Sequence, residues 1–254
     1  MLPPITVKYP ISPVKPSLAT AQVRDLFGLG DSELSLAIAE DVVLDIRAGD
    51  VVLFTGPSGS GKSSLLRAVG LHLGAFDVDT LNLPKAALID AMPGTVDERL
   101  AALSACGLSE PRLWVRTPAE LSDGQRFRFR IAIALAAVRA EFFLVDEFAA
   151  VLDRTLAKVL AFNIRKAATQ AARGLVEKVG LLLATTHDDL LDDLNPDVHV
   201  RCYGEGRIDV ERRDVKKNLS ASRTSFGSRT VPSAIGRTSL GGITAPTTSP
   251  SRAA

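Results

Sequence analysis

Long apolar stretches, paired cysteines and aromatic side chains are all scarce in this chain of 254 residues. The best apolar stretch, residues 131–138, is far shorter than the roughly 18 residues that a membrane-spanning helix needs. No basic region followed by an apolar stretch opens the chain, so we expect no secretory signal. Cys106 and Cys202 are isolated in the sequence, which excludes a disulfide framework and a cysteine metal site. These absences predict a cytoplasmic protein in a reducing compartment.

Acidic residues are absent from the C-terminal segment 215–254, which carries six lysines and arginines. The segment contributes +6 to a net charge of +1, so the rest of the chain sums to −5. It is rich in Ser, Thr, Gly and Pro, and we expect it to be disordered. One interpretation is a solvated tail that aids solubility, and the other is electrostatic binding to nucleic acid.

Prolines are most frequent at the other end of the chain, where five of them fall within the first sixteen residues. Proline fixes φ and lacks an N–H group, so we expect residues 1–21 to form an extended arm. Residues 22–214 are long enough to bury one sizeable core, and we expect them to form a single domain.

A glycine-rich loop is the most informative segment, because residues 56–63 match the pattern G-x-x-x-x-G-K-[ST] without a mismatch. The apolar run 51–55 before it predicts a buried strand, and residues 64–69 predict a helix. Such a loop turns backbone N–H groups toward an anion, and the helix dipole adds positive potential. We expect Lys62 to reach the β- and γ-phosphates of a nucleotide and the Ser63 hydroxyl to hold Mg²⁺. The predicted phosphate-loop contacts are Gly56, Pro57, Ser58, Gly59, Ser60, Gly61, Lys62, Ser63 and Ser64.

Two further segments carry chemistry. Residues 121–125 read Leu-Ser-Asp-Gly-Gln, and Ser122 or Asp123 is suited to cap a helix over 125–139. Residues 142–147 form an apolar strand that ends in two acids. Asp146 is placed to hold Mg²⁺ through water, and Glu147 is placed to orient or deprotonate an attacking water.

In this order and at roughly this spacing, these segments resemble the nucleotide-binding domain of an ABC-class ATPase over about residues 22–213. Residues 56–64 match its phosphate loop, 121–125 its signature motif and 142–147 its acidic strand. Residues 151–153 match its D-loop, and His187 follows an apolar strand as its switch histidine does. The resemblance implies an α/β phosphate-loop NTPase fold with a mostly parallel sheet, a small antiparallel β subdomain and a helical subdomain that is reduced here.

The resemblance also implies a mechanism with ATP and Mg²⁺ as cofactors. Two such domains form a head-to-tail homodimer, and Ser122 and Gly124 of one subunit contact the γ-phosphate of the ATP held by the other. Gln125 and Asp153 are further expected nucleotide contacts. Glu147 is the expected general base, and His187 is expected to contact the γ-phosphate.

Three departures from the family pattern stand out. The family carries a glutamine after the strand that follows the phosphate-loop helix, but no glutamine occurs between Gln22 and Gln125. We expect that strand at residues 86–93, with Asp90 as the nearest polar substitute. Phe27 is the best candidate for the aromatic residue that stacks on adenine, ahead of Tyr9. Phe148 stands where a proline is common.

Several other elements are predicted from local patterns. Strands are expected over 42–46 and 51–55 around a turn at 48–50, and a hairpin is expected from 198–203 and 207–212. The segment between Lys62 and Leu121 is short, with 58 intervening residues, and its one clear helix is expected over 96–106.

The sequence therefore predicts a soluble ABC-class ATPase that drives a conformational cycle on a soluble or nucleic-acid partner. The alternative is the ATP-binding subunit of an ABC transporter that works with a separate membrane protein. A third interpretation is a regulatory module that closes on ATP and turns it over slowly.

Overall fold

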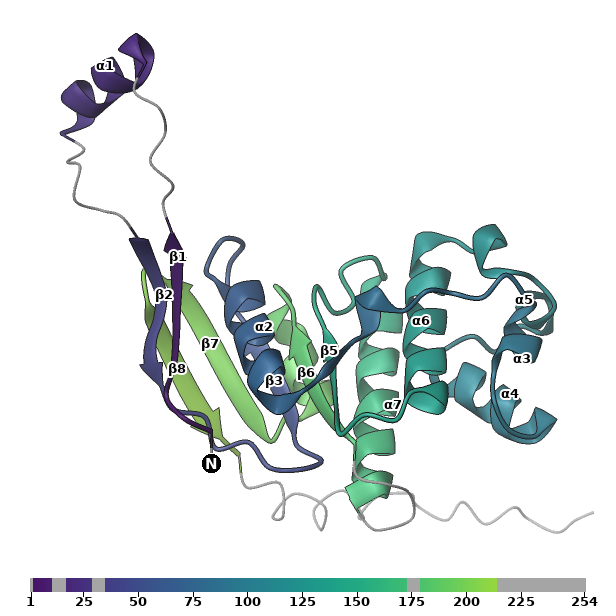
Figure 1. Cartoon of the computed structure of the whole chain (residues 1–254). Coiled ribbons are helices and arrows are strands. Elements are labelled where there is room, and N and C mark those ends of the chain that lie inside the picture. The colour runs from purple at the N-terminus through teal and green to yellow at the C-terminus, as the bar shows by residue number, and fades with distance from the viewer. Residues whose placement is uncertain (1, 11–16, 29–34, 173–178, 214–254) are drawn as a thin grey trace, which may run out of the picture. The chain divides into compact units, whose positions relative to one another are not determined.

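A six-stranded sheet forms the centre of the computed structural model, which describes residues 2–10, 17–28, 35–172 and 179–213 (Figure 1). The described residues belong to one compact unit, and the predicted C-terminal tail lies outside them. The strand order is β4-β5-β6-β3-β7-β8. All neighbouring strands in this sheet run parallel except the last pair, β7 and β8. The strands are β3 (Val51–Thr55), β4 (Phe76–Asp77), β5 (Phe142–Val145), β6 (Gly180–Ala184), β7 (Val198–Gly204) and β8 (Arg207–Arg212).

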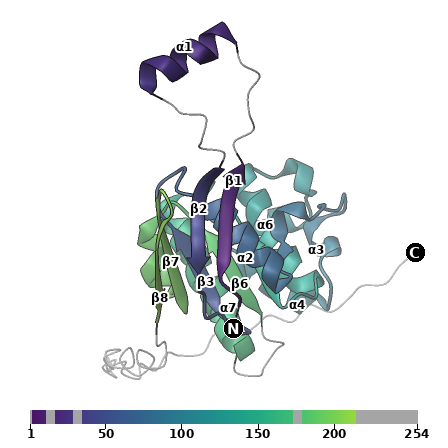
Figure 2. The ribbon, with the colours of Figure 1, turned by 60° about the vertical axis from the view of Figure 1, so that its left-hand side comes forward.

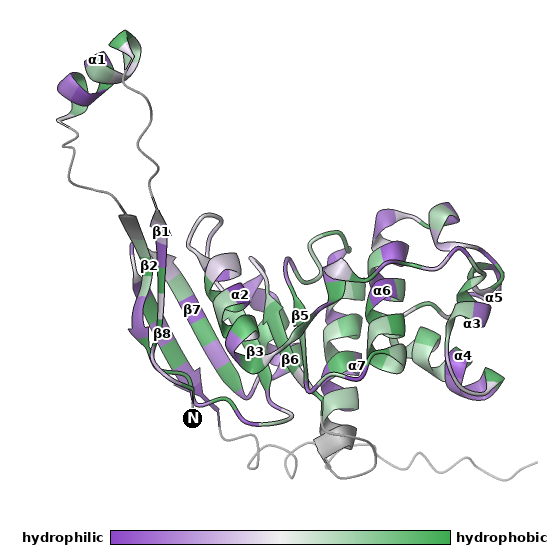
Figure 3. Cartoon of the chain, in the orientation of Figure 1, coloured by the Kyte–Doolittle hydropathy of each residue, from purple (hydrophilic) through white to green (hydrophobic). Residues whose placement is uncertain are grey.

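Every residue of strands β3, β5 and β6 is buried, as expected for parallel strands covered on both faces. This explains their continuous apolar sequence, which is visible as green strands in Figure 3, whereas β7 alternates between apolar and polar residues. Strands β3, β5 and β6 and the terminal hairpin therefore match their predicted positions, whereas β4 was not predicted. Both cysteines are buried and unpaired, and burial raises the pKa of the Cys106 thiol to about 12.

Alternate residues of the central strands point to two separate cores. Val52 and Phe54 face a core that contains α2 (Lys62–Leu73) and residues of a second, antiparallel sheet. That sheet consists of β1 (Ile5–Pro10) and β2 (Ser35–Val42), seen side by side in Figure 2. Val51 and Leu53 face the other core, built mainly on α6 (Asp123–Ala137) and α7 (Arg154–Ala172).

The remaining helices are short. Between the phosphate loop and α6 lie the 3₁₀ helix η1 (Val78–Thr80), α3 (Leu88–Ala91), α4 (Val96–Ala105), α5 (Pro111–Trp114) and the 3₁₀ helix η2 (Pro118–Glu120). After β6 come η3 (Asp188–Leu190) and α8 (Leu191–Leu194), and α1 (Leu18–Phe27) buries none of its residues. Helix α4 matches its prediction, and Thr95 and Glu98 form a capping box at its start.

The structure corrects three of the predicted elements. The strand expected over 86–93 is absent, because α3 occupies this segment. No strand covers residues 43–46, because the strand in this region, β2, already ends at Val42. That strand pairs with β1 and not with β3. The predicted boundary between residues 21 and 22 falls inside α1, and β1 places Ile5 in the core with 1% exposure. Part of the expected arm is therefore a strand of the domain.

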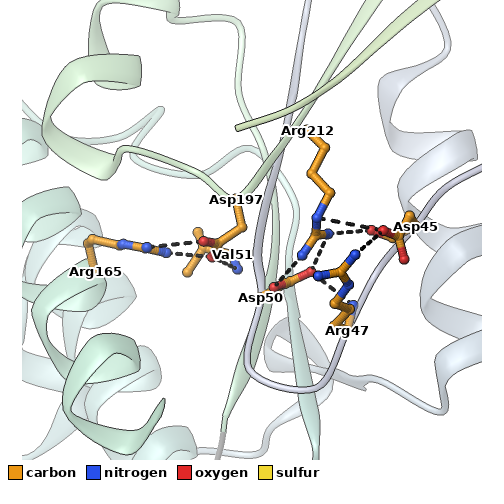
Figure 4. A network of polar contacts seen from close by, with 7 residues as sticks. All are labelled: Asp45, Arg47, Asp50, Val51, Arg165, Asp197 and Arg212. Carbon is orange, nitrogen blue, oxygen red and sulfur yellow. Dashed lines mark hydrogen bonds and ion pairs between the residues drawn. The ribbon is translucent and has the colours of Figure 1, made fainter. Parts of the chain in front are cut away.

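Two ion-pair networks hold the end of the sheet at which β3 begins (Figure 4). Asp197 accepts the backbone N–H of Val51 at 2.9 Å and pairs with Arg165 of α7 at 2.6 Å. Asp50 accepts the backbone N–H of Arg47 at 2.9 Å and pairs with Arg212 of β8 at 2.8 Å. These contacts tie α7, the start of β3 and the edge strand together.

Candidate functional site

A cavity of about 520 Å³ lies at the carboxyl ends of β3, β5 and β6. This is the edge of a parallel sheet where ligands bind in open α/β folds. Its lining brings the phosphate loop, the acidic strand and the end of β6 together. The lining residues are Tyr9, Ile38, Ser58, Gly59, Gly61, Lys62, Ser63, Ser64, Asp146, Glu147, Ala150, Ala184, Thr185 and Thr186.

Two glycines of the loop have conformations and neighbours that only glycine permits. Gly56 has φ +139°, and a Cβ atom there would overlap the carbonyl oxygen of Cys202 on β7. Gly61 has φ +90° and precedes α2, and a Cβ atom would overlap the Ile38 side chain. The loop is therefore held against β7 on one side and against the antiparallel sheet on the other.

Lys62 is 8% exposed, and its Nζ donates to the carbonyl oxygen of Pro57 at 2.6 Å. Burial lowers the pKa of this lysine, and the charge of Asp146 is among the influences that oppose the change. A buried ammonium with few partners is suited to an anionic ligand, because the ligand supplies the charge that the fold does not.

Asp146 is the residue that joins the loop to the acidic strand. Its Oδ1 accepts the Ser63 hydroxyl at 2.9 Å and the Glu147 N–H at 3.0 Å, and its Oδ2 pairs with Arg67 of α2 at 3.0 Å. A hydroxyl and a carboxylate side by side, next to a phosphate cradle, are the oxygen ligands that Mg²⁺ prefers. The residues present therefore fit a magnesium ion bound with a nucleotide.

Glu147 has a left-handed backbone with φ +49°, which is uncommon for a residue other than glycine. The next residue, Phe148, donates its N–H to the carbonyl oxygen of Ala184 at 2.6 Å, and this bond anchors the turn to β6. Strained backbone of this kind persists where the surrounding structure holds it and clusters at functional sites. The exposed Glu147 side chain lines the cavity.

The signature residues lie apart from this cavity. Ser122 caps α6: its hydroxyl accepts the Gln125 N–H at 3.3 Å, and Gln125 Oε1 accepts the Ser122 N–H at 3.1 Å. Gly124 packs against the D-loop, because a Cβ atom there would lie 3.2 Å from the Val151 carbonyl oxygen. Neither Ser122, Gly124 nor Gln125 is among the described residues that line the cavity.

The D-loop and the switch segment also lie beside the cavity rather than in its lining. Asp153 Oδ1 accepts the N–H of Leu156 at 3.0 Å in the first turn of α7. His187 follows the lining residue Thr186, and its N–H donates to Thr185 Oγ1 at 3.2 Å. An ion pair between Arg154 and Asp189 connects the two segments.

Phe27 is the expected contact of the adenine, but of the two aromatic candidates only Tyr9 lines the cavity in the described part of the chain. Phe27 is 74% exposed on α1 and is absent from the cavity lining, whereas Tyr9 lines it. The distance along the chain to Lys62 favoured Phe27. The pairing of β1 with β2 places Tyr9 opposite Leu36, two residues before Ile38, whose side chain also lines the cavity. Stacking of either aromatic residue on adenine stays a prediction.

Asp90 was expected to replace the missing glutamine, and it lies exposed on α3 instead. The strand after α2 is β4, which pairs with β5 so that Asp77 lies opposite Leu144. The polar residue at its carboxyl end is Asp79, which lines a cavity of about 270 Å³ together with Asp146 and Glu147. A strand of two residues has no periodic pattern, so the sequence could not reveal this position.

A phosphate cradle between a buried strand and a helix, with an acidic strand beside it, defines a phosphate-loop NTPase. Aliphatic sulfonates import ATP-binding protein SsuB 3 of Nocardia farcinica is 32% identical over 188 residues, which are 66% of this chain and 72% of that protein. Lipoprotein-releasing system ATP-binding protein LolD of Novosphingobium aromaticivorans is 30% identical over 185 residues, 56% of this chain and 80% of LolD. The chain belongs to the ABC-class ATPases, and it is an ATP hydrolase of that class.

Further comparisons agree with this family. Hemin import ATP-binding protein HmuV of Rhodococcus jostii is 26% identical over 218 residues, 71% of this chain and 73% of HmuV. Two solved structures share the fold. The dimeric bacterial ABC transporter cassette MJ0796 has a TM-score of 0.51 and 20% identity, and the match covers 71% of this chain and 93% of that one. A nucleotide-free ATP-binding cassette from an ABC transporter has a TM-score of 0.52 and 19% identity, and the match covers 76% of this chain and 92% of that one. No protein-family model matches the chain.

Proposed function

We propose that this chain is the ATP-binding subunit of an ABC transporter and that it hydrolyses MgATP in a head-to-tail homodimer beside a separate membrane protein. The names of the three relatives support this role, because each is an ATP-binding protein of an import or releasing system. None of the three names supports the nucleic-acid partner that the basic tail suggested. Within the described residues, no helix is both long enough and apolar enough to cross a membrane.

The single observation that carries the dimer is the position of the signature. Ser122 and Gly124 lie outside the cavity that the phosphate loop lines, so one subunit alone does not enclose a nucleotide with both motifs. A second copy, related by a two-fold axis, would present its signature to this cavity and receive the same contact in return. The site is thus complete only when two copies meet.

Within that dimer, each residue of the cavity has a separate task. Lys62 and the loop N–H groups bind the phosphates, and Ser63 and Asp146 hold Mg²⁺, which neutralises phosphate charge when it is bound. Glu147 accepts the proton of the attacking water. His187, one residue beyond the lining, contacts the γ-phosphate once the subunits close.

A soluble partner is the second candidate, and two observations favour it. No glutamine stands at the end of β4, and the helices between the phosphate loop and α6 are short, with α3 and α5 of four residues each. The region that would grip a membrane protein is therefore small in this chain. A stable complex with a co-expressed membrane protein encoded beside the gene supports the transporter, and a complex with a soluble neighbour supports the second candidate.

Mixing of two inactive variants tests the shared site. Lys62→Ala disables the phosphate loop and Ser122→Arg disables the signature, so a mixed dimer contains one site with both motifs intact. We expect ATPase activity to reappear when the two variants are mixed. A mixture of Lys62→Ala with Glu147→Gln is the matched control and should stay inactive, since neither of its sites is complete. Failure of the first mixture to regain activity would contradict the head-to-tail arrangement.

A further inference from the structure

Arg67 of α2 contacts the carboxylate of Asp146 without being part of the nucleotide cavity. Its Nη2 group donates to Asp146 Oδ2 at 3.0 Å. Asp146 lines the 520 Å³ cavity, whereas Arg67 is absent from the described residues that line it. The arginine therefore acts on the carboxylate and is not a further wall of the phosphate cradle, in contrast to Lys62, which does line the cavity.

Close packing of α2 on β5 brings this arginine to the carboxylate. A Cβ atom at Gly70 would lie 2.6 Å from Leu144 Cδ1, so the helix approaches the strand at a distance that glycine permits. Arg67 lies one turn before Gly70 on the same face of the helix. Asp146 comes two residues after Leu144, so the alternation of a strand directs it to the same side. Core packing, and not only a flexible side chain, therefore sets the position of the ion pair.

Both oxygens of the Asp146 carboxylate have partners in the structure. Oδ1 accepts the Ser63 hydroxyl and the Glu147 N–H, and Oδ2 accepts Arg67. The Asp146 side chain is only 11% exposed, so water screens its charge less than that of a surface carboxylate. The Arg67 side chain is 66% exposed, so its guanidinium can leave the carboxylate and remain hydrated. Arg67 is therefore a counterion that a stronger cation can displace.

Four charged side chains surround the proposed magnesium position, and their charges cancel. Lys62 and Arg67 carry two positive charges, and Asp146 and Glu147 carry two negative ones. A divalent cation that arrives alone meets no net attraction and competes with Arg67 for the carboxylate. A cation that arrives with ATP brings the negative charge of the phosphates with it, and Lys62 then pairs with phosphate. The charge balance therefore favours a cation bound to nucleotide over a free one.

We infer that Arg67 is the counterion of Asp146 and that it excludes a divalent cation that arrives without nucleotide. The inference rests on the proposed function only in taking Ser63 and Asp146 as the magnesium ligands. Arg67 is thus a positioning residue: it neutralises and holds the carboxylate until a cation bound to ATP displaces it. Loss of its charge leaves a carboxylate without a counterion, and such a carboxylate attracts a free cation.

Binding of Mn²⁺ without nucleotide tests this role. The probe is Mn²⁺ alone, and its unbound fraction is measured by paramagnetic resonance. We expect Arg67→Gln to lower the Mn²⁺ concentration for half-saturation at least about fivefold, because a positive charge beside the cation is removed. Arg67→Lys keeps the charge and should stay within about twofold of the original chain. Arg112→Gln, a matched loss of charge at an exposed position on α5, should leave Mn²⁺ binding unchanged.

The gain must depend on Asp146 and must not reflect a disturbed fold. The double variant Arg67→Gln with Asp146→Asn should lose the gain in Mn²⁺ affinity. Thermal unfolding gives a second readout, because a ligand that binds only the folded chain raises its Tm. Mg²⁺ alone should therefore raise the Tm of Arg67→Gln by more than it raises the Tm of the original chain. Unchanged Mn²⁺ affinity in Arg67→Gln, or a gain that survives Asp146→Asn, would overturn the inference.

Mn²⁺ binding in the presence of ATP separates this inference from the proposed function. The original chain should then bind Mn²⁺, and Asp146→Asn should bind it at least about tenfold more weakly. If this holds while Arg67→Gln shows no gain without nucleotide, only the role of Arg67 is wrong. If Mn²⁺ binding with ATP does not depend on Asp146, the proposed magnesium site is wrong and the role of Arg67 is wrong with it.

Discussion

The Nε2 atom of His199 lies 2.9 Å from the Oγ1 atom of Thr55, the residue that precedes the phosphate loop. Both side chains are 2% exposed, and His199 Nδ1 has no partner among the described residues. Burial lowers the pKa of His199 to about 4, and the nearby charges of Arg201 and Arg213 add to this effect. The imidazole is therefore neutral at physiological pH and supports the last residue of β3.

Stability should depend on pH through this histidine. In the unfolded chain His199 titrates near its ordinary pKa of 6.5, so between pH 6.5 and 4 the unfolded state binds a proton that the folded state does not. The free energy of unfolding should therefore fall as the pH falls through this window, by about 2 kcal/mol at pH 5. His199→Gln should remove this part of the loss in urea denaturation at pH 5 and pH 7. His72→Gln, at an exposed position, should retain it.

Removal of the proposed base should separate binding from turnover. Glu147→Gln keeps the shape of the side chain but cannot accept the proton of water, so we expect the hydrolysis rate to fall by ~10²–10⁴-fold. ATP affinity, measured by nucleotide titration, should stay within a factor of about three. Glu141→Gln, just before β5 and exposed, is the control and should hydrolyse ATP at the original rate. Turnover of Glu147→Gln at the original rate would assign the base to another residue.

Contact between the phosphate loop and the antiparallel sheet should limit what residue 61 tolerates. Gly61→Ala places a Cβ atom on the Ile38 side chain at a φ of +90°, so we expect ATP affinity to fall about tenfold or more. Ile38→Ala should relieve the overlap but not the backbone strain, so the double variant should recover part of the lost affinity. Full recovery would show that overlap alone excludes a side chain, and no recovery would show that φ decides.

The network at the other end of the sheet should contribute to stability and not to hydrolysis. Asp197→Ala leaves the N–H of Val51 and the guanidinium of Arg165 without this carboxylate, and we expect a loss of roughly 3 kcal/mol. Urea denaturation measures the loss, and kcat at a temperature where the variant is folded should be unchanged. Glu40→Gln, in an exposed pair with Lys8, should unfold like the original protein. A variant at Asp197 with original stability would show that the network is not a stabilising contact.

The sequence predicted elements that a local pattern encodes, and it failed where contacts distant in the chain decide. Strands β3, β5 and β6 were recognised because burial on two faces leaves a continuous apolar run. Leu44 and Ile46 mimicked a strand, since their side chains enter the core without any ladder pairing of their backbone. The positive φ of Asp41, near the end of β2, gave no sequence signal at all.

The candidate site also contains residues that contiguous sequence predicts and residues that only strand pairing places. The phosphate loop, Asp146 and Glu147 were found from contiguous residues whose chemistry depends on their spacing. Tyr9 was ranked behind Phe27, and Asp79 was missed, because strand pairing, and not distance along the chain, carries these two residues to the cavities. A local sequence pattern does not predict which strands pair when the strands lie far apart in the chain.

The two ends of the central sheet also differ in the effect that a substitution is expected to have. Loop residues at the carboxyl ends line the cavity, while the carboxylates of Asp50 and Asp197 hold the amino end of β3 and do not line it. We therefore expect that stability lost through a substitution at the cavity can be regained by a substitution at the amino end of the sheet, without a change in the cavity lining. The lining of the cavity and the contacts that stabilise the sheet can therefore change independently of each other in this protein.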